Sequence, residues 1–420
     1  MRPIHQYLND HLGPGLITGA ADDDPSGIAT YSQAGAQFGF GMLWSVFLTT
    51  PLMIGIQVVS ARIGRVSGHG IAANLREHYP RPLLFFVVVL LLVANTLNIA
   101  ADIGAMGEAL RLVAGGSAHL YTILFGVIVV LMQWLLPYQR LAPVLKWLTL
   151  TLFAYVAVLF TVHVPWSEVV IATLLPPVRL DAEYLMLLVA VLGTTISPYL
   201  FFWQASQEVE EQRAREGEEP LRRAPEQGRR HLRRIKIDTW VGMTFSNGIA
   251  FCIMLTTAVT LHRAGITDIQ TSAQAAEALR PLAGNLAFTL FALGIIGTGL
   301  LAVPVLAGSA AYAVAEAMQW PIGHALKPLE AKGFYGIIGI ATILGVAIDF
   351  TSIDPIKALV GAAIVNGIVS VPIMAVMMCM AVKPEIMGSF TIRKRLQRLG
   401  WLATGFMAVA VTAMLVALVV

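Results

Sequence analysis

Residues 16–39 read LITGAADDDPSGIATYSQAGAQFG, an apolar segment with Asp22, Asp23 and Asp24 in its middle and Pro25 directly after them. A charged side chain at membrane depth is costly and normally faces a polar cavity or an ion path. Proline interrupts a helix, and free backbone groups at that depth are tolerated only where they line a cavity. The segment therefore predicts a broken membrane helix in which Asp24 lines a polar cavity. Asp22 and Asp23 are expected at the rim of that cavity or protonated.

Asp24 also has a local alternative. An Asp before a proline fits a helix N-cap, because Asp is favoured at the cap and proline at the first helical position. That interpretation explains Asp24 and Pro25. It does not explain the two preceding acids, nor why a cap lies in the middle of an apolar segment, so we favour the cavity.

The composition is that of an integral membrane protein. Of the 420 residues, 57% are hydrophobic and only 13% are charged, with a mean hydropathy of +0.72, whereas soluble domains carry about 25% charged residues. The two cysteines, Cys252 and Cys379, lie in apolar runs, which indicates neither a disulfide framework nor a zinc site. Residues 1–15 are polar over too long a stretch for a secretory signal peptide.

Eleven apolar stretches are long enough to cross about 30 Å of hydrocarbon. None of them shows the alternation of a β-strand, so we expect an all-α integral membrane protein with eleven transmembrane helices. The predicted spans are 13–36, 40–61, 82–110, 119–138, 143–163, 184–206, 238–261, 286–318, 334–350, 356–382 and 398–420.

The distribution of Lys and Arg predicts the orientation. With eleven spans and the N-terminus inside, 23 of the 28 Lys and Arg residues fall in cytoplasmic segments and 5 in outer ones. Cytoplasmic loops of membrane proteins carry an excess of these residues. We therefore expect a cytoplasmic N-terminus and a C-terminus outside the cell membrane.

One segment looks soluble. Residues 207–237 mix Glu and Arg densely, which is typical of a solvated cytoplasmic connector, in part a short charged helix. A regulatory or lipid-headgroup-binding loop is the alternative.

A second break is predicted in the sixth span, where Ser197 precedes Pro198. Two sets of five spans, each opening with a broken helix, are typical of transporters built from inverted repeats, in which half-helix ends point at a midplane substrate. The carboxylate at the first break favours a cation. We expect one transmembrane transporter domain over 1–420, with repeats at 12–164 and 184–382 and an eleventh helix at 398–420.

Four motifs follow one another in the order of a known family. Asp24-Pro25-Ser26-Gly27 stands where that family carries Asp-Pro-Gly-Asn, and SPYLFFWQA, residues 197–205, where it carries Met-Pro-His-Asn-Leu-Tyr-Leu-His-Ser. QVVSARIGRVSGHGIA, 57–72, and RRIKIDTWVGMTFSNGIAF, 233–251, are similar to its second-span ending and seventh-span start. The sequence thus resembles the Nramp divalent-metal transporters, and more closely their divergent Nramp-related branch, whose members include magnesium carriers. The resemblance implies a LeuT-like fold.

The resemblance also implies an ion site. Relatives bind transition metals through the first-span Asp and Asn, a backbone carbonyl and the Met sulfur. Here Gly27 lacks the Asn side chain and Ser197 replaces the thioether with a hydroxyl. Oxygen ligands suit Mg²⁺ and Mn²⁺, and a partly hydrated Mg²⁺ suits the wider site. The expected metal-binding residues are Asp24, Ser197, the carbonyl-donating position Thr194, and the further carboxylates Asp23 and Asp22.

Proton coupling is expected to be weak or absent. The family's route uses two sixth-span histidines, which are Tyr199 and Gln204 here, and a third-span acid pair, of which Asp102 remains. Gln does not titrate and Tyr titrates far from neutrality. Asp102 is the candidate proton relay, with a hydrogen-bonded buried acid as the alternative. Asn366, in the tenth span where relatives place a Gln near the ion, is a candidate ligand or a polar contact between helices.

Together these features predict a secondary transporter that moves a divalent metal cation, with Mg²⁺ or Mn²⁺ favoured, by alternating access. The cation is the cargo, no cofactor is expected, and the partners are the cation and the lipid bilayer, not nucleic acid. One alternative is a cation-dependent carrier of the same fold for a small organic solute such as an amino acid. Another is a channel or ion-sensing membrane protein without alternating access. The sequence contains no catalytic triad, metal cluster or nucleotide loop, so we do not expect an enzyme.

Overall fold

The computed structural model describes residues 13–135, 148–323, 326–350 and 354–419. These residues form helices joined by loops and short 3₁₀ turns, and no strand occurs among them, so the predicted all-α fold is confirmed. The helices are α2 (Pro14–Asp22), α3 (Pro25–Phe38), α4 (Leu43–Ser67), α5 (Ile71–His78), α6 (Arg81–Ala114), α7 (Ala118–Leu135), α9 (Phe153–Val158), α10 (Trp166–Leu174), α11 (Ala182–Thr195), α12 (Pro198–Ala214), α13 (Gly228–Thr257), α14 (Ser272–Ala276), α15 (Arg280–Ala283), α16 (Ala287–Met318), α17 (Lys332–Asp349), α18 (Pro355–Met380), α19 (Pro384–Met387) and α20 (Lys394–Ala417).

Nine stretches within the described ranges are long and apolar enough to cross a membrane. One of them, Pro25–Ser67, joins α3 to α4 and so covers two predicted spans. The predicted span 143–163 is not among them: it begins outside the described residues, and its remainder holds a 3₁₀ turn and α9. Each other predicted span corresponds to one long helix or, in the first and sixth, to a pair of helices.

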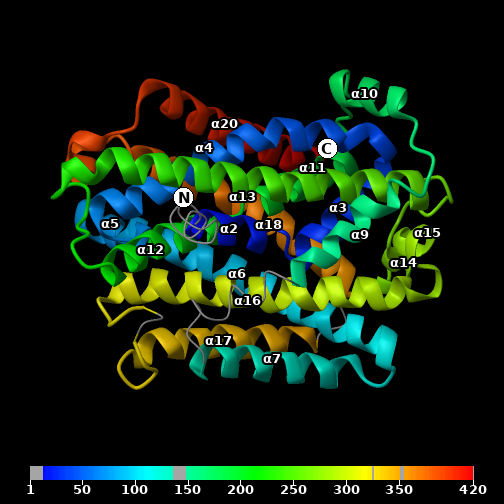
Figure 1. Ribbon diagram of the computed structural model, residues 1–420, viewed down its shortest axis with the longest axis horizontal. Helices are drawn as coiled ribbons and strands as arrows, with labels where there is room; N and C mark the ends of the chain where they lie inside the picture. Colours follow the sequence, from blue (N-terminus) through cyan, green and yellow to red (C-terminus); the bar gives the residue numbers. More distant parts are fainter. Residues whose placement is uncertain (1–12, 136–147, 324–325, 351–353, 420) are drawn as a thin grey trace, which may run out of the picture.

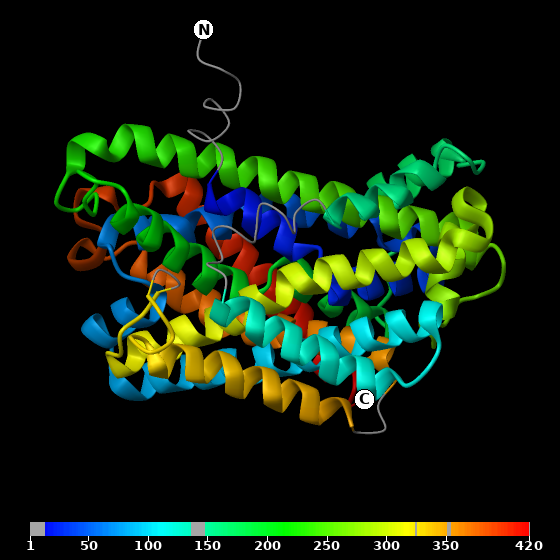
Figure 2. The ribbon, with the colours of Figure 1, turned by 60° about the horizontal axis from the view of Figure 1, so that its bottom comes forward.

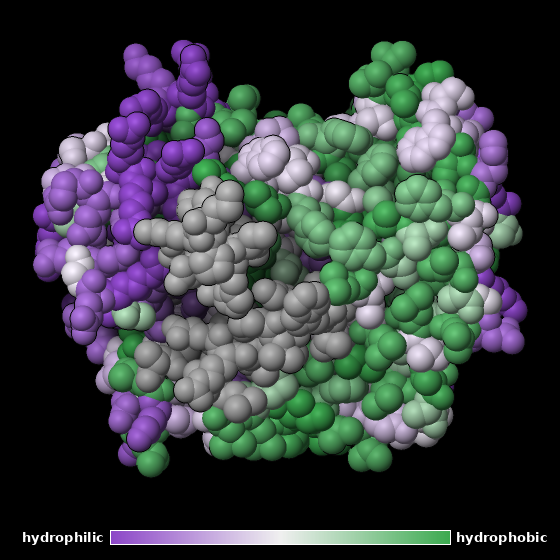
Figure 3. Space-filling model, viewed as in Figure 1, coloured by the Kyte–Doolittle hydropathy of each residue, from purple (hydrophilic) through white to green (hydrophobic). Residues whose placement is uncertain are grey.

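The long helices run along the longest axis of the molecule (Figure 1). In Figure 3 the surface is hydrophilic at the ends of that axis and largely hydrophobic between them. The more hydrophilic end carries α5 and the connection between α12 and α13. Helices α7 and α17 lie side by side at one edge of the bundle in both ribbon views (Figures 1 and 2). A hydrophobic band between polar ends is the surface that a multi-pass protein presents to a bilayer.

Both predicted helix breaks are confirmed. Between α2 and α3, Asp24 has an extended backbone and Pro25 opens the new helix. Between α11 and α12, Ser197 is extended and Pro198 opens the new helix in the same way. The local cause is the proline ring, which pushes the preceding residue out of the helical region and favours the first position of the next helix. The two breaks are therefore fixed by dipeptides of the same kind.

The short helix α2 depends on α13 for its N-terminus. The Asp238 carboxylate accepts hydrogen bonds from the backbone N–H groups of Gly15, at 2.7 Å, and Leu16, at 3.0 Å. These are N–H groups of the first turn, which have no partner within their own helix. The two backbones also touch, since a methyl group added at Gly19 would lie 2.4 Å from the carbonyl of Gly242. Helix α2 is thus held by a side chain more than 220 residues away in the chain.

The charged segment 207–237 is exposed over most of its charged side chains, but not over all of them. Helix α12 continues to Ala214 and α13 begins at Gly228, so both ends of the segment are helical. Arg234 on α13 is buried and pairs with Glu208, at 2.5 Å, and with Glu211 on α12. The opposite charges meet because the two helices are neighbours across the connection. This group of charges therefore joins two helices, whereas most of the other charged side chains in the segment are exposed.

The loop between these helices is attached to the end of α4. The backbone N–H groups of Leu221 and Arg222 donate to the carbonyls of Arg65, at 3.2 Å, and Val66, at 3.1 Å. The buried Arg65 side chain pairs with Glu218 in the same loop. Partial burial raises the pKa of the Glu218 carboxyl, but the hydrogen bond and charge of Arg65 outweigh it, so the net pKa is lowered.

Removal of the cap on α2 should destabilise the protein. We expect Asp238→Ala to lower the free energy of unfolding by about 1–3 kcal/mol, because the N–H groups of Gly15 and Leu16 lose their acceptor. Unfolding of the purified protein in detergent measures this. Asp268→Ala is the control, since Asp268 is an exposed loop residue. Equal stability of the two variants would show that the cap contributes nothing.

Candidate metal centre

Asp24 lies at the break of the first span, and both of its carboxylate oxygens have protein partners. Oδ1 accepts a hydrogen bond from the backbone N–H of Gly27 at 2.6 Å, so the side chain caps α3. Oδ2 is 3.3 Å from the Tyr199 hydroxyl, which is also 3.0 Å from the carbonyl oxygen of Ala21. Only 2% of the Asp24 surface is exposed. Asp24 is thus an N-cap and, through Tyr199, is also in contact with the second broken helix.

The two breaks meet in the interior. A methyl group added at Gly27, at the start of α3, would lie 3.2 Å from Thr194 Oγ1, at the end of α11. One turn further along α3, the Tyr31 hydroxyl is 3.2 Å from Thr195 Oγ1. Gly27, which stands where the resemblance places an Asn, therefore brings α3 close to the Thr194 side chain.

Ser197 and Thr194 lie at the second break and are buried. The Ser197 hydroxyl is 2.7 Å from the carbonyl of Gly193 and 2.8 Å from that of Thr194. Its single hydrogen is directed at the last turn of α11, which leaves lone pairs on the Ser197 oxygen. Ser370 of α18 donates to the carbonyl of Ile196 at 2.7 Å. Hard oxygen atoms are therefore concentrated at this break.

Asp22 and Asp23 are held from another helix. The Ser246 hydroxyl of α13 lies 2.6 Å from Asp22 Oδ2 and 3.0 Å from Asp23 Oδ1. Asp22 Oδ1 has no hydrogen-bond partner within the described part of the chain. In that part, no group of three or more His, Cys, Asp or Glu side chains is arranged to hold a metal ion. The three acids are all buried, but they do not form a ready carboxylate cage.

Asn366 forms a reciprocal pair of side-chain amides with Asn98 on α6. Each amide donates to the other, with N–O distances of 2.8 and 3.1 Å. The carbonyl of Leu359 on α18 accepts a hydrogen bond from the Ser26 hydroxyl at 2.8 Å. Leu359 and Ser370 lie at helical spacing from Asn366 on the same helix. This face of α18 therefore follows both breaks, and Asn366 lies between its two contacts with them.

Asp102 and Gln204 occupy the positions considered for proton transfer. Asp102, one turn beyond Asn98 on α6, is fully buried and interacts electrostatically with Asp24. Gln204 donates to Thr239 Oγ1 on α13 at 2.9 Å. The Gln204 amide thus joins α12 to α13, whereas Asp102 is near the candidate metal ligand.

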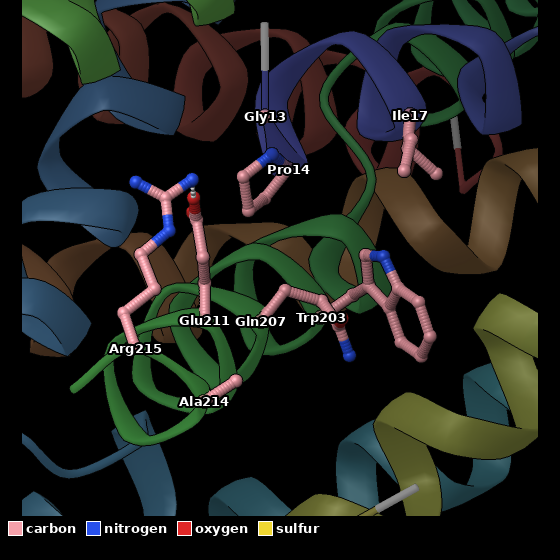
Figure 4. A pocket seen from close by; sticks show the side chains of 8 residues that line it. All are labelled: Gly13, Pro14, Ile17, Trp203, Gln207, Glu211, Ala214 and Arg215. Carbon is pink, nitrogen blue, oxygen red and sulfur yellow. Dashed lines mark ion pairs between the residues drawn. The ribbon is translucent and has the colours of Figure 1, made fainter. Parts of the chain in front are cut away.

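Two cavities lie at opposite ends of the broken first span. The α2-side cavity, of about 270 Å³, lies between the start of α2 and α12. In Figure 4, Trp203 and Glu211 of α12 lie across the cavity from Pro14 and Ile17 of α2, and Glu211 is paired with Arg215. The α3-side cavity, of about 400 Å³, is bordered by residues from α3, α11, α18 and the loop before α14, including Gln33, Gln37, Glu183, Asp268 and Lys357.

The sequence analysis missed several of these residues. Gln33 is hydrogen-bonded to the loop before α14, at 2.9 Å to the Ile269 N–H and 3.3 Å to the Thr267 carbonyl. Gln37 donates to Glu183 at 3.1 Å. The available signal was the pair of amides one helical turn apart in an apolar span. Ser246 had no comparable signal, because its importance comes from the helix it faces.

The family of the chain is identified by comparison with known families. Residues 15–417 match the model of the family described as "Nramp: Natural resistance-associated macrophage protein-like". The chain belongs to the Nramp family. This Nramp protein is 30% identical over 296 residues to the "Divalent metal cation transporter MntH" of Klebsiella pneumoniae (strain 342), which covers 69% of this chain and 68% of the relative.

Solved structures show the same fold at low identity. The manganese transporter of Eremococcus coleocola, solved with an aromatic bis-isothiourea compound, superposes with a TM-score of 0.76 at 15% identity, over 99% of this chain and 87% of that one. MhsT in complex with L-phenylalanine gives a TM-score of 0.56 at 13% identity, over 96% and 97%. The predicted LeuT-like architecture of this Nramp protein is thereby confirmed.

The Asn98–Asn366 pair should show energetic coupling. We expect Asn98→Ala or Asn366→Ala to cost about 1–3 kcal/mol of stability, since each leaves a buried amide without its partner. The double variant should cost clearly less than the sum, as measured by unfolding in detergent. Combining Asn98→Ala with Asn247→Ala, whose amide bonds Thr50 on α4, is the additive control. Additivity in the first pair would contradict the coupling.

Proposed function

We propose that this Nramp protein carries a hard divalent cation, with Mg²⁺ or Mn²⁺ favoured, across the cell membrane by alternating access. Its family membership makes it a multi-pass divalent metal cation transporter of the MntH type and not an enzyme, and the metal is its substrate. The proposal concerns the ion, the residues that bind it and the coupling.

The main observation that supports this proposal is the position of Asp24. Its buried carboxylate lies where two broken helices meet, between the α2-side and α3-side cavities. Transporters of this architecture bind their substrate at such a point and open it alternately to the two sides. An anionic oxygen there attracts a cation and repels the carboxylate of an organic solute, which argues against the alternative carrier.

Ligand chemistry supports a hard ion. Asp24, Ser197 and the carbonyl of Thr194 supply oxygen only, and Ser197 stands where relatives have a sulfur. Oxygen donors suit Mg²⁺ and Mn²⁺, whereas thioethers suit softer metals. We place Asn366, Asp23 and Asp22 as outer partners, able to hold water of a partly hydrated Mg²⁺.

We further propose transport without tight proton coupling. Tyr199 and Gln204 stand at the histidine positions of relatives, and Gln204 is hydrogen-bonded between two helices. Asp102, with its electrostatic interaction with Asp24, is the remaining candidate relay.

The orientation and the repeats complete the proposal. With a cytoplasmic N-terminus and an external C-terminus, the α2-side cavity faces the cytoplasm. The five-helix repeats are assigned to 12–164 and 184–382, and 398–420 is the eleventh helix. The excess of Lys and Arg in the segments assigned to the inside supports the proposed orientation.

Asp24 should be required for transport. In proteoliposomes we expect saturable uptake of Mn²⁺ and Mg²⁺, and a fall of at least about tenfold in Asp24→Ala, because the only charged ligand among the assigned inner groups is lost. Vesicles that also contain a pH-sensitive dye should show no stoichiometric acidification.

The matched control is Asp181→Ala. Asp181 caps α11 through the N–H of Tyr184, at 3.1 Å, as Asp24 caps α3. It separates loss of a cap from loss of a ligand and should leave uptake within about twofold. Uptake that persists in Asp24→Ala, or metal-independent uptake of an amino acid, would contradict the proposal.

Ser197 should set the preference between hard and soft ions. We expect Ser197→Met to raise Cd²⁺ uptake relative to Mg²⁺ by about tenfold, or about 1.4 kcal/mol, because sulfur stabilises soft ions. Competition uptake assays measure the ratio. Ser197→Ala removes the hydroxyl without adding sulfur and should not reproduce the shift. An unchanged order in Ser197→Met would exclude this position from ion selection.

A further inference from the structure

Tyr199 joins the two broken helices at the candidate metal centre. It is the second residue of α12 and is fully buried. Its hydroxyl lies 3.0 Å from the carbonyl of Ala21 on α2 and 3.3 Å from Asp24 Oδ2 at the start of α3. One side chain on α12 thus contacts both halves of the first span.

The contact concerns the oxygens that remain for a cation. Asp24 Oδ1 already accepts the short hydrogen bond of the Gly27 N–H. Asp24 Oδ2 and the Ala21 carbonyl form a second oxygen pair, and the Tyr199 hydroxyl is directed at it. A hydroxyl has a single hydrogen to donate. The Tyr199 hydrogen is therefore shared between the Ala21 carbonyl and Asp24 Oδ2.

A phenol hydrogen and a cation cannot occupy the same side of this oxygen pair. A divalent ion bound to Asp24 Oδ2 and the Ala21 carbonyl would face the positive end of the hydroxyl, so Tyr199 has to turn away when the ion binds. When the ion leaves, a buried carboxylate and a buried carbonyl need a new partner, because an unsatisfied buried acceptor is costly. Tyr199 is in position to be that partner.

We propose that Tyr199 is a positioning residue whose hydroxyl replaces the departed cation on Asp24 Oδ2 and the Ala21 carbonyl. It thereby allows the cargo-free carrier to close and return. The inference rests on the proposed function, since it needs a cation that binds Asp24. It assigns to Tyr199 a role in the return step and no transfer of a proton.

The proposal separates two kinds of flux. Net uptake requires the carrier to return without cargo, whereas exchange of one ion for another does not. Loss of the hydroxyl removes the substitute partner and also the competitor of the cation. Tyr199→Phe should therefore slow net uptake, preserve exchange and bind the cation more tightly.

Mn²⁺ is the probe for the experiment. Proteoliposomes measure net Mn²⁺ uptake into metal-free vesicles, and tracer exchange with equal Mn²⁺ on both sides. Calorimetry measures Mn²⁺ binding to the purified protein. For Tyr199→Phe we expect net uptake to fall at least fivefold, exchange to stay within twofold of wild type, and the Kd to fall at least threefold.

Tyr184→Phe is the matched control. Tyr184 is also a buried tyrosine, and its hydroxyl accepts a hydrogen bond from the Trp44 indole at 3.0 Å, away from the centre. This variant should leave both fluxes and the Kd unchanged. Thermal unfolding in detergent monitors the folding of each variant. If Tyr199→Phe cannot be purified, Tyr199→Leu takes its place in the same assays, since it also lacks the hydroxyl.

Two results would overturn the inference. A parallel fall of net uptake and exchange would make Tyr199 a purely structural residue, and unchanged fluxes with an unchanged Kd would remove it from the cycle. Failure of the proposed function is recognised separately, because wild-type protein would then show neither saturable Mn²⁺ flux nor a loss of binding in Asp24→Ala.

Discussion

The structure depends on the need to give buried oxygen and N–H groups partners where two membrane helices are interrupted. Each proline break frees backbone groups in the interior, and the first break adds three buried carboxyl groups. Gly27 serves Asp24 from within α3. The other partners come from other helices: Tyr199 serves Asp24, Ser246 serves Asp22 and Asp23, and Ser370 serves the carbonyl of Ile196. To supply these partners, α11, α12, α13 and α18 pack around α2 and α3. The oxygens that these donors satisfy are also the groups that the proposed cation would bind.

Local rules made the spans and both breaks predictable. Hydropathy identifies helices long enough to cross a bilayer, and an Asp or Ser before proline marks a helix start whatever surrounds it. Asp24 and Ser197 were found because they lie at these starts, and Thr194 because the family resemblance places a carbonyl donor there. Asp238, Ser246 and Gln33 were not, since their roles come from residues more than 200 positions away. The same reason explains the segment 207–237: its charge density was visible, but the pairing of Arg234 with Glu208 across two helices was not. Asn366 was noticed for its position, and its amide pair with Asn98 required the structure.

The family membership and the individual residues of this chain determine different properties. The family supplies the architecture and the class of cargo, whereas the departures at Gly27, Ser197, Tyr199 and Gln204 supply the individual features of this chain. Gly27 permits α3 to approach Thr194, and Ser197 donates its hydrogen to the last turn of α11, which leaves lone pairs on its oxygen. Gln204 takes a structural position between α12 and α13. In the proposed function, these substitutions change the donor atoms around Asp24 and thereby the preferred ion.

The capping of α2 by Asp238 has a consequence for biosynthesis. A chain is made from its N-terminus, and its early parts adopt structure first. The partners of α2 and its acids, Tyr199, Asp238 and Ser246, come 178, 223 and 224 residues after the groups they bind. When the first span leaves the ribosome, its three aspartates and its opening N–H groups therefore have to be satisfied by water or by the insertion machinery. The candidate metal centre is complete only after the tenth predicted span, which carries Ser370 and Asn366, has arrived. It is therefore among the late products of assembly, although its central residue is among the first to be synthesised.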